Sequence, residues 1–406
     1  MIRAVRDAYR EAFSGLPRAV WLLAFVTFVN RSGTMVLPFL ALYLAEKKGF
    51  SVTGAGAILS LYGIGAMAGA YLGGWLSDML NPRRVLEWSL ALTGVGFLVL
   101  GSIDSHAGIA VMVIALSVVG EAFRPATAAS LAESVARGES VRALALNRLA
   151  VNLGMTFGPA AGGFLAVHDY AWLFIVDGGT CLLAAVFLRV AFRGERRAAR
   201  EADAAVEESA RSPWRDGAIL ALALMTTAFA IAIFQIFGTY PLFLHGIYGF
   251  SEPAIGILLS INTIGIVVLQ MPVVHATRAH RPLRVAGLGA FLFCAGLALM
   301  PLGSSYLFIA CTVLVWTAGE MLSLPIIEGF VADRADERNR GRYMAVLSLS
   351  FSLAFIVAPV AGTWTYQRVG PDAVWYSCGA VGLLLWAALG ALSRRVGYED
   401  GGPRSG

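Results

Sequence analysis

Twelve long apolar runs constrain the fold of this chain more than any other feature of its sequence. Each run has about 20 residues or more, the length that an α-helix needs to cross a bilayer. Only 14% of the residues are charged and 58% are hydrophobic, whereas soluble domains usually carry about 25% charged residues. Because backbone polar groups in lipid must be satisfied internally, we expect each run to be a helix. The expected spans are Val20–Leu44, Val52–Ser77, Val85–Ser102, Gly108–Leu131, Ala143–Val167, Trp172–Phe192, Gly217–Leu244, Pro253–His275, Leu283–Gly303, Tyr306–Phe330, Tyr343–Tyr366 and Ala373–Ser393.

The positions of the basic residues predict the orientation in the membrane. Of the 31 Lys and Arg residues, 24 lie in one alternating set of connecting segments and termini, and three lie in the other set. Loops rich in Lys and Arg stay in the cytoplasm. We therefore expect both termini in the cytoplasm and a multi-pass protein of a bacterial inner membrane. The net charge of +5 follows from this pattern, and nucleic-acid binding is not expected.

The two halves of the chain match each other at a constant offset of 200 residues. Gly49-Phe50-Ser51 aligns with Gly249-Phe250-Ser251, and Pro159 aligns with Pro359. The register holds across loops as well as apolar runs, which indicates a duplicated six-helix unit. We predict a first bundle over 1–192, a cytoplasmic linker over 193–216 and a second bundle over 217–406. Two similar bundles can rock about a site between them, which gives alternating access to a solute.

The loop after the second span carries a recognisable pattern, from Gly74 to Arg84. It resembles the most general signature of the major facilitator superfamily, Gly-x-Leu-Ala-Asp-Arg-x-Gly-Arg-Lys. The matching residues are Gly74, Leu76, Asp78 and Arg83, and the departures are Met79, Asn81 and Pro82. Asn81 tolerates the left-handed backbone that a turn here is expected to need. The resemblance implies a cytoplasmic gate motif of Gly74, Asp78, Arg83 and Arg84 that latches the two halves. The alternative is that these are solvated loop charges.

A second pattern lies in the fifth span, where glycines repeat around a proline. The residues are Gly154, Gly158, Pro159, Gly162 and Gly163. They resemble the helix-5 motif of the family's antiporter branches, although the more distant upstream glycine is replaced by Ala145. A plain packing face of small residues is the alternative. Together the resemblances imply an all-α membrane protein with twelve helices in two pseudo-symmetric six-helix bundles. The whole chain is most similar to the proton-driven drug and metabolite antiporters.

Polar residues in the middle of the apolar runs are the candidates for the transport site. A charge at this depth costs about 2.5–3.5 kcal/mol on insertion scales, so each one is a functional hypothesis. They fall on the first, fourth, seventh and tenth spans, which line the cavity in the family that the chain resembles. The candidates for the substrate cavity are Asn30, Arg31, Arg124 and Gln235.

Two acidic residues at the same depth are the candidates for proton coupling. Glu320 is the first choice, because no basic residue lies three or four positions away on its own helix. Glu121 is the second choice. It lies three positions before Arg124 and can pair with it, so a structural ion pair is the alternative for these two residues. Pro125 follows directly and is expected to bend the helix there. Asp177, in the sixth span, lies at a shallower depth than these residues.

Several function classes lack support in the sequence. It contains no Walker motif, no catalytic constellation and no Cys or His spacing typical of a metal site. We therefore expect neither an enzyme nor a protein with a cofactor or a metal. The leading hypothesis is a monomeric secondary transporter that exchanges protons for a small amphipathic solute across the bilayer. The alternative is a proton-coupled symporter for uptake of a peptide, sugar or other metabolite. A membrane-embedded enzyme or a receptor is a more distant possibility.

Overall fold

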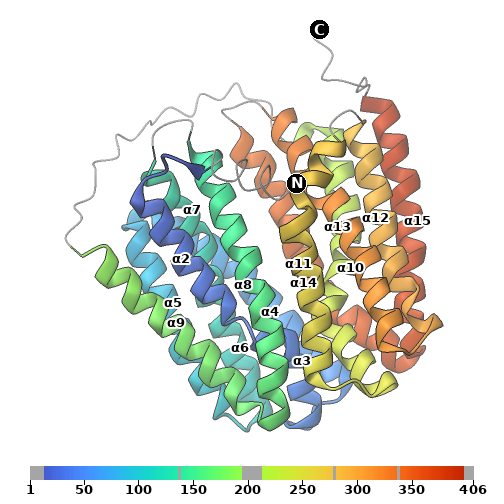
Figure 1. Ribbon diagram of the computed structural model, residues 1–406, viewed down its shortest axis with the longest axis horizontal. Helices are drawn as coiled ribbons and strands as arrows, with labels where there is room; N and C mark the ends of the chain where they lie inside the picture. The colour runs from blue at the N-terminus through green and yellow to red at the C-terminus, as the bar shows by residue number, and fades with distance from the viewer. Residues whose placement is uncertain (1–12, 136–138, 194–212, 278–279, 336–338, 397–406) are drawn as a thin grey trace. The chain divides into compact units, whose positions relative to one another are not determined.

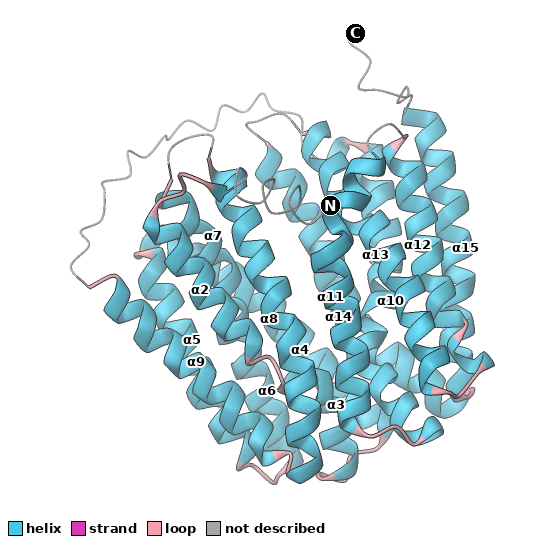
Figure 2. Ribbon diagram, in the orientation of Figure 1, coloured by secondary structure: helices cyan, strands magenta, loops and turns pink. Residues whose placement is uncertain are grey.

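The computed structural model describes residues 13–135, 139–193, 213–277, 280–335 and 339–396. Within these ranges every regular element is a helix (Figure 2). Twelve helical segments are long and apolar enough to cross a membrane, which confirms the predicted number of spans. Most of the predicted linker, over 194–212, lies outside the described residues.

Figure 1 labels the helices that make up the spans. The helices of the first six spans are α2 (Arg18–Ser32), α3 (Val36–Glu46), α4 (Val52–Met79), α5 (Pro82–Gly101), α6 (His106–Glu121), α7 (Phe123–Glu133), α8 (Ser140–His168) and α9 (Ala171–Ala191). The remaining helices are η1 (Pro213–Arg215), α10 (Gly217–Tyr248), α11 (Glu252–Thr277), α12 (Pro282–Ala298), η2 (Met300–Leu302), α13 (Tyr306–Arg334), α14 (Arg340–Arg368) and α15 (Pro371–Val396).

Short polar side chains start several of these helices, and the repeat reuses the same device. The Ser105 hydroxyl accepts a hydrogen bond from the Gly108 amide at the start of α6, and Ser305 does the same for Phe308 in α13. Asn81 accepts from the Arg83 amide at the start of α5. Its φ of −73° and ψ of 121° are extended, so the expected left-handed turn at Asn81 is wrong. Because the Asn81 side chain caps α5 directly, the chain enters the helix without a left-handed residue.

Two spans of the first half are broken in the middle. The first span was expected to be one helix, but it divides into α2 and α3 with Gly33–Met35 between them. The fourth span divides into α6 and α7 at Ala122. Pro125 has no N–H, so it leaves the Glu121 carbonyl without its usual helical partner, as expected from the proline. The equivalent spans of the second half, α10 and α13, are each continuous.

The chain forms two compact units. Unit 1 comprises residues 1–39, 61–199 and 251–263, and unit 2 comprises 40–60, 200–250 and 264–406. The first turns of α11 therefore belong to unit 1, and the end of α3 with the start of α4 belongs to unit 2. The two units therefore differ from the predicted bundles over 1–192 and 217–406, because each unit includes a short segment from the other half of the chain.

Each of these short segments has a glycine that lies close to a backbone carbonyl of the unit to which the segment belongs. In unit 1, a side chain at Gly256 of α11 would meet the Pro159 carbonyl of α8. In unit 2, a side chain at Gly56 of α4 would lie 2.7 Å from the Pro359 carbonyl of α14. Glycines at such positions let two helix backbones come into direct contact. The two contacts are related by the offset of 200 residues.

The glycines of the fifth span bring α8 against the broken first span in unit 1. A Cβ added at Gly154 would lie 2.6 Å from the Arg31 Cβ, and one at Gly158 would lie 2.6 Å from the Thr34 carbonyl. One at Gly162 would lie 3.0 Å from the Met35 Cβ. Gly154, Gly158 and Gly162 of the predicted motif therefore pack along the break. Gly163, the last glycine of the motif, lies against the start of α11 instead.

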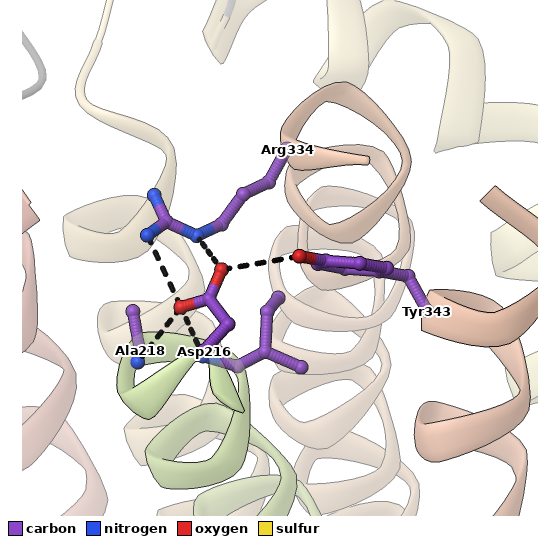
Figure 3. A network of polar contacts seen from close by, with 5 residues as sticks. Asp216, Ala218, Arg334 and Tyr343 are labelled. Atoms are coloured by element: carbon purple, nitrogen blue, oxygen red, sulfur yellow. Dashed lines mark hydrogen bonds and ion pairs between the residues drawn. The ribbon is translucent and has the colours of Figure 1, made fainter. Parts of the chain in front are cut away.

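A polar network joins three helices in unit 2 (Figure 3). Arg334, at the end of α13, donates to both carboxylate oxygens of Asp216, from Nε at 2.7 Å and from a terminal nitrogen at 3.1 Å. The same carboxylate accepts from the Ala218 amide at 3.1 Å and so caps α10. The Tyr343 hydroxyl, in the first turn of α14, lies 3.5 Å from it. Burial raises the pKa of Asp216, but these donors and the charge of Arg334 outweigh burial and hold it below its usual value.

Replacing Gly154 by Ala should destabilise the protein by about 1–3 kcal/mol, because the added methyl group overpacks the contact with Arg31. The matched control is Gly179→Ala on α9, where an added Cβ meets no atom within 4 Å. The measurement is the midpoint of thermal unfolding in detergent. Equal midpoints for the two variants would show that the α8 contact is not tight.

Replacing Asp216 by Asn should cost about 1 kcal/mol at neutral pH, since Asn still caps α10 but loses the charge that pairs with Arg334. A carboxyl group with a lowered pKa contributes stability above its unfolded pKa and loses it as the pH falls. The gap between the melting midpoints of wild type and variant should therefore close below about pH 4. A gap that stays constant from pH 7 to pH 3 would contradict this assignment.

Candidate functional site

Several charged and aromatic side chains of unit 1 lie at or beside its two broken spans. We call this cluster the broken-helix site and define it by Arg31, Tyr62, Glu121, Phe123 and Asp177. Arg31 lies in the last turn of α2, Glu121 ends α6, and Phe123 begins α7. Tyr62 comes from α4 and Asp177 from α9. Each break thus places a functional group at a helix end inside the membrane.

Arg31 combines a favourable helix position with an incompletely satisfied head group. As a cation in the last turn of α2 it complements the negative end of the helix dipole. Its guanidinium carbon lies 5.5 Å from the centre of the Phe123 ring, in a cation–π contact. Its Nε is buried and has no hydrogen-bond partner in the part of the chain that the structure describes. Arg31 therefore has donor capacity left for a polar or anionic group.

The Glu121 carboxylate lies closer to the Tyr62 hydroxyl than to the Arg124 guanidinium. The Tyr62 hydroxyl donates to one carboxylate oxygen at 3.3 Å. The predicted pair with Arg124 exists, but at 4.0 Å and with 74% of the Arg124 side chain exposed against 19% for Glu121. An ion pair with one partner so exposed contributes little to stability. The carboxylate of Glu121 is thus positioned by Tyr62 while Arg124 is left mainly accessible.

Asp177, like Tyr62, belongs to this site but was not among the residues predicted from the sequence. It is 3% exposed, and its Oδ2 accepts hydrogen bonds from the Met35 amide at 3.1 Å and the Val36 amide at 3.2 Å. These are donors at the start of α3, which the break in the first span leaves without helical partners. The signal in the sequence was an acidic residue within an apolar run, together with Gly33 in the first span.

The other candidates for the substrate cavity have partners in the surrounding helices. The Asn30 amide donates to the Cys181 sulfur of α9 at 3.3 Å. In unit 2, Gln235 is 3% exposed and donates to the Ala358 carbonyl of α14 at 3.0 Å. Gly362 makes room for its side chain. Glu320 is half-buried in α13, also in unit 2. Gln235 and Glu320 are therefore not members of the broken-helix site.

The four residues of the predicted gate motif lie in unit 1, where α4 ends and α5 begins. A Cβ added at Gly74 would lie 4.0 Å from the Pro125 Cβ, in ordinary van der Waals contact. Asp78 is exposed, and its carboxylate has no hydrogen bond or ion pair among the described residues. Arg83 stacks on the Phe192 ring at 4.2 Å and donates to the Ser134 hydroxyl at 3.4 Å. Arg84 is exposed.

The chemistry of the broken-helix site suits a small polar or amphipathic molecule. It offers a cation stacked on an aromatic ring and a carboxylate that can gain or lose a proton. Within the described ranges, no three His, Cys, Asp or Glu side chains lie together as a metal site requires. The side chains present can bind and orient a solute and exchange a proton.

Comparison with known proteins agrees with this architecture. The model of the Major Facilitator Superfamily matches residues 20–335 and 220–404. A Na(+), Li(+), K(+)/H(+) antiporter of Planococcus maritimus is 24% identical and covers 86% of this chain and 91% of its own length. The multidrug resistance protein MdtH of Proteus mirabilis is 21% identical, with coverages of 87% and 89%. A crystal structure of a POT family transporter in complex with 5-aminolevulinic acid has a TM-score of 0.81 at 14% identity, covering 95% of this chain and 98% of that one.

The family model matches well over half of the chain and runs through both halves of the repeat. The twelve spans, the duplication and the polar groups at mid-membrane depth agree with that match. This multi-pass membrane protein therefore belongs to the Major Facilitator Superfamily of transporters.

Proposed function

We propose that the protein is a proton-coupled antiporter that exports a small amphipathic solute. The observation that carries this proposal is the broken-helix site, where Arg31 lies on Phe123 and the Glu121 carboxylate is held by Tyr62. An acidic group of this kind can take up a proton in one state of the transport cycle and release it in another. Two relatives point the same way, because one is named an antiporter with protons and the other a multidrug resistance protein.

The export cycle we propose uses the duplication of the chain. The six-helix halves over 1–192 and 217–406, joined by the linker 193–216, rock about a central solute site. Both termini lie in the cytoplasm of a bacterial cell, and the protein acts as a monomer in the inner membrane. The gate motif of Gly74, Asp78, Arg83 and Arg84 latches the halves in one of the two states. Asp78 supports this role, because its carboxylate is exposed and has no ionic partner within the described residues.

Arg31 narrows the class of solute in this proposal. A permanent cation at mid-membrane depth repels cationic drugs and favours neutral, zwitterionic or anionic molecules. The Phe123 ring under Arg31 favours molecules with an apolar part. Phe28, next to Arg31 on α2, is in edge contact with Phe157 of α8 at 6.2 Å between ring centres. An amphipathic solute with a carboxylate or phosphate group fits this combination.

A second candidate function is proton-coupled uptake of a peptide or other metabolite. The specific observation in its favour is the buried Nε of Arg31 in the first span, which has no hydrogen-bond partner within the described residues and suits the carboxylate of such a solute. The structural similarity to the POT family transporter supports the fold but not the substrate. The direction of proton movement relative to the solute separates the two candidates.

The test uses purified protein in liposomes that contain a pH-sensitive dye, with an imposed pH gradient and a panel of solutes. The panel includes zwitterionic and anionic amphiphiles, short peptides and Na⁺. Antiport predicts that adding a transported solute on the acidic side dissipates the gradient. Symport predicts that protons and solute enter together, and that result would replace the export proposal.

The acidic candidates are tested in the same liposomes. Glu320→Gln and Glu121→Gln should each reduce solute-dependent proton movement to the level of protein-free liposomes, because neither amide can carry a proton. The matched control is Glu139→Gln, whose side chain is 37% exposed and pairs with Arg142 outside the site. If Glu320→Gln or Glu121→Gln retains proton movement driven by solute, that residue is not a coupling site.

A further inference from the structure

We propose that Asp177 is a proton-binding site of this transporter, and that its protonation releases the start of α3 from α9. This inference deepens the proposed function, because it rests on proton coupling and names a further residue that carries the proton. It also assigns a consequence to proton binding, namely a change in the first span at the level of Arg31.

Within the described chain, only backbone amides donate hydrogen bonds to the buried carboxylate of Asp177. Oδ2 of Asp177 accepts both the Met35 and the Val36 amides, at 3.1 and 3.2 Å. Oδ1 accepts no hydrogen bond from the residues that the structure describes. A proton arriving from the aqueous phase therefore has an oxygen to bind, and it converts the carboxylate to a neutral carboxylic acid.

Within the described chain, Asp177 forms no ion pair with an ionisable side chain of the helices around it. On α2 the charged groups are Arg18 and Arg31, and α3 carries only Glu46 at its far end. Tyr62 and Asp78 come from α4, and Cys181 and Arg189 lie on α9 itself. The α5 helix contributes Arg83, Arg84 and Glu87, and α8 contributes Arg142, Arg148 and His168. Glu87 and Arg189 pair with each other.

The charge of Asp177 is thus balanced mainly by the start of α3. A carboxylate at the N-terminal end of a helix is stabilised by the helix dipole and by the unpaired amides. Hydrogen bonds to an ionised acceptor are about twice as strong as those between neutral groups. Protonation removes the ionic part of both bonds and leaves the two amides poorly satisfied in a medium without water. The start of α3 is then free to find another arrangement.

Tight packing makes the break responsive to such a change. Gly33 lies against Thr180, one helical turn from Asp177, and any side chain at Gly33 would overlap the Thr180 hydroxyl. Gly154, Gly158 and Gly162 of α8 pack against residues 31–35 of the same break. A shift at Met35 is therefore transmitted to Arg31 and to α8. Close-packed contacts of this kind move between discrete arrangements rather than deforming smoothly.

The second half of the repeat lacks this arrangement, which argues against a purely structural requirement of the fold. Ser377 occupies the position equivalent to Asp177, at the offset of 200 residues. Its hydroxyl donates to the Val374 carbonyl of its own helix at 2.7 Å. The equivalent span, α10, is continuous through residues 233–235. The same architecture thus forms without a break and without the acid.

The test is hydrogen–deuterium exchange of the protein in lipid nanodiscs, with protons as the only ligand. Exchange of peptides covering residues 30–38 is measured from pH 8 to pH 5 and corrected for the intrinsic rate. In the wild type, protection of Met35 and Val36 should fall by about tenfold across this range. Asp177→Asn cannot gain or lose a proton, so its protection should be independent of pH. Asp177→Ala should lose protection at every pH.

Two controls keep the assignment specific. Glu121→Gln should retain the pH-dependent exchange of the wild type, because it leaves Asp177 unchanged. Melting midpoints establish that Asp177→Asn is folded, since the substitution preserves the shape of the side chain. Protection that is constant with pH in the wild type, or that still falls with pH in Asp177→Asn, would overturn the proposal.

Proton movement in liposomes separates this inference from the proposed function. If the wild type moves protons with solute and Asp177→Asn does not, Asp177 carries a coupled proton. If Asp177→Asn moves protons as the wild type does, the inference fails while the proposed function stands. If the wild type moves no protons with any solute of the panel, the proposed function fails, and coupling through Asp177 fails with it even where exchange depends on pH.

Discussion

The first half of this transporter depends on the two hydrogen bonds between Asp177 and the start of α3. In a bilayer, backbone amides without partners are costly, so a helix can break only where other groups satisfy them. Asp177 supplies that partner from α9, and the break at Gly33–Met35 becomes stable. The break ends α2 directly after Arg31, which puts a cation at a helix C-terminus inside the membrane. The position of Arg31 over Phe123 is therefore a consequence of where α2 stops.

The two halves share one plan but stabilise its centre differently. In the first half, charged groups and broken helices meet at Arg31, Glu121 and Asp177. In the second half, the neutral Gln235 of a continuous α10 bonds to the backbone of α14. Gly362 provides the space for that side chain, as Gly162 provides it for Met35. Duplication therefore preserved the small residues that let helices approach, while the polar groups diverged. The broken-helix site therefore has no counterpart with the same charged groups at the equivalent positions of α10 and α15.

Parts of the candidate site could be predicted from the sequence because they depend on neighbours along one helix. Glu121 and Arg124 are three residues apart, and Pro125 removes a hydrogen bond four residues back, so both the pair and the break follow from local geometry. The structure qualifies the pair, since Arg124 is mainly exposed and Tyr62 holds the carboxylate. Tyr62 and Asp177 were not predicted, because each acts on a residue of a different helix. The prediction of a left-handed backbone at Asn81 is wrong, because its backbone is extended and its side chain caps α5.

The sequence by itself determined that this is a twelve-span membrane protein with a duplicated plan, because span length and repeat register are set by bilayer thickness and by residue order. It also identified the charged residues within the apolar runs as functional candidates, because a charge in lipid is costly. Only the tertiary structure decided which of those charges meet. The break between α2 and α3, the hydrogen bonds of Asp177 and the stacking of Arg31 on Phe123 depend on the rotation of each helix about its own axis. Packing between helices sets that rotation, and no single apolar run encodes it.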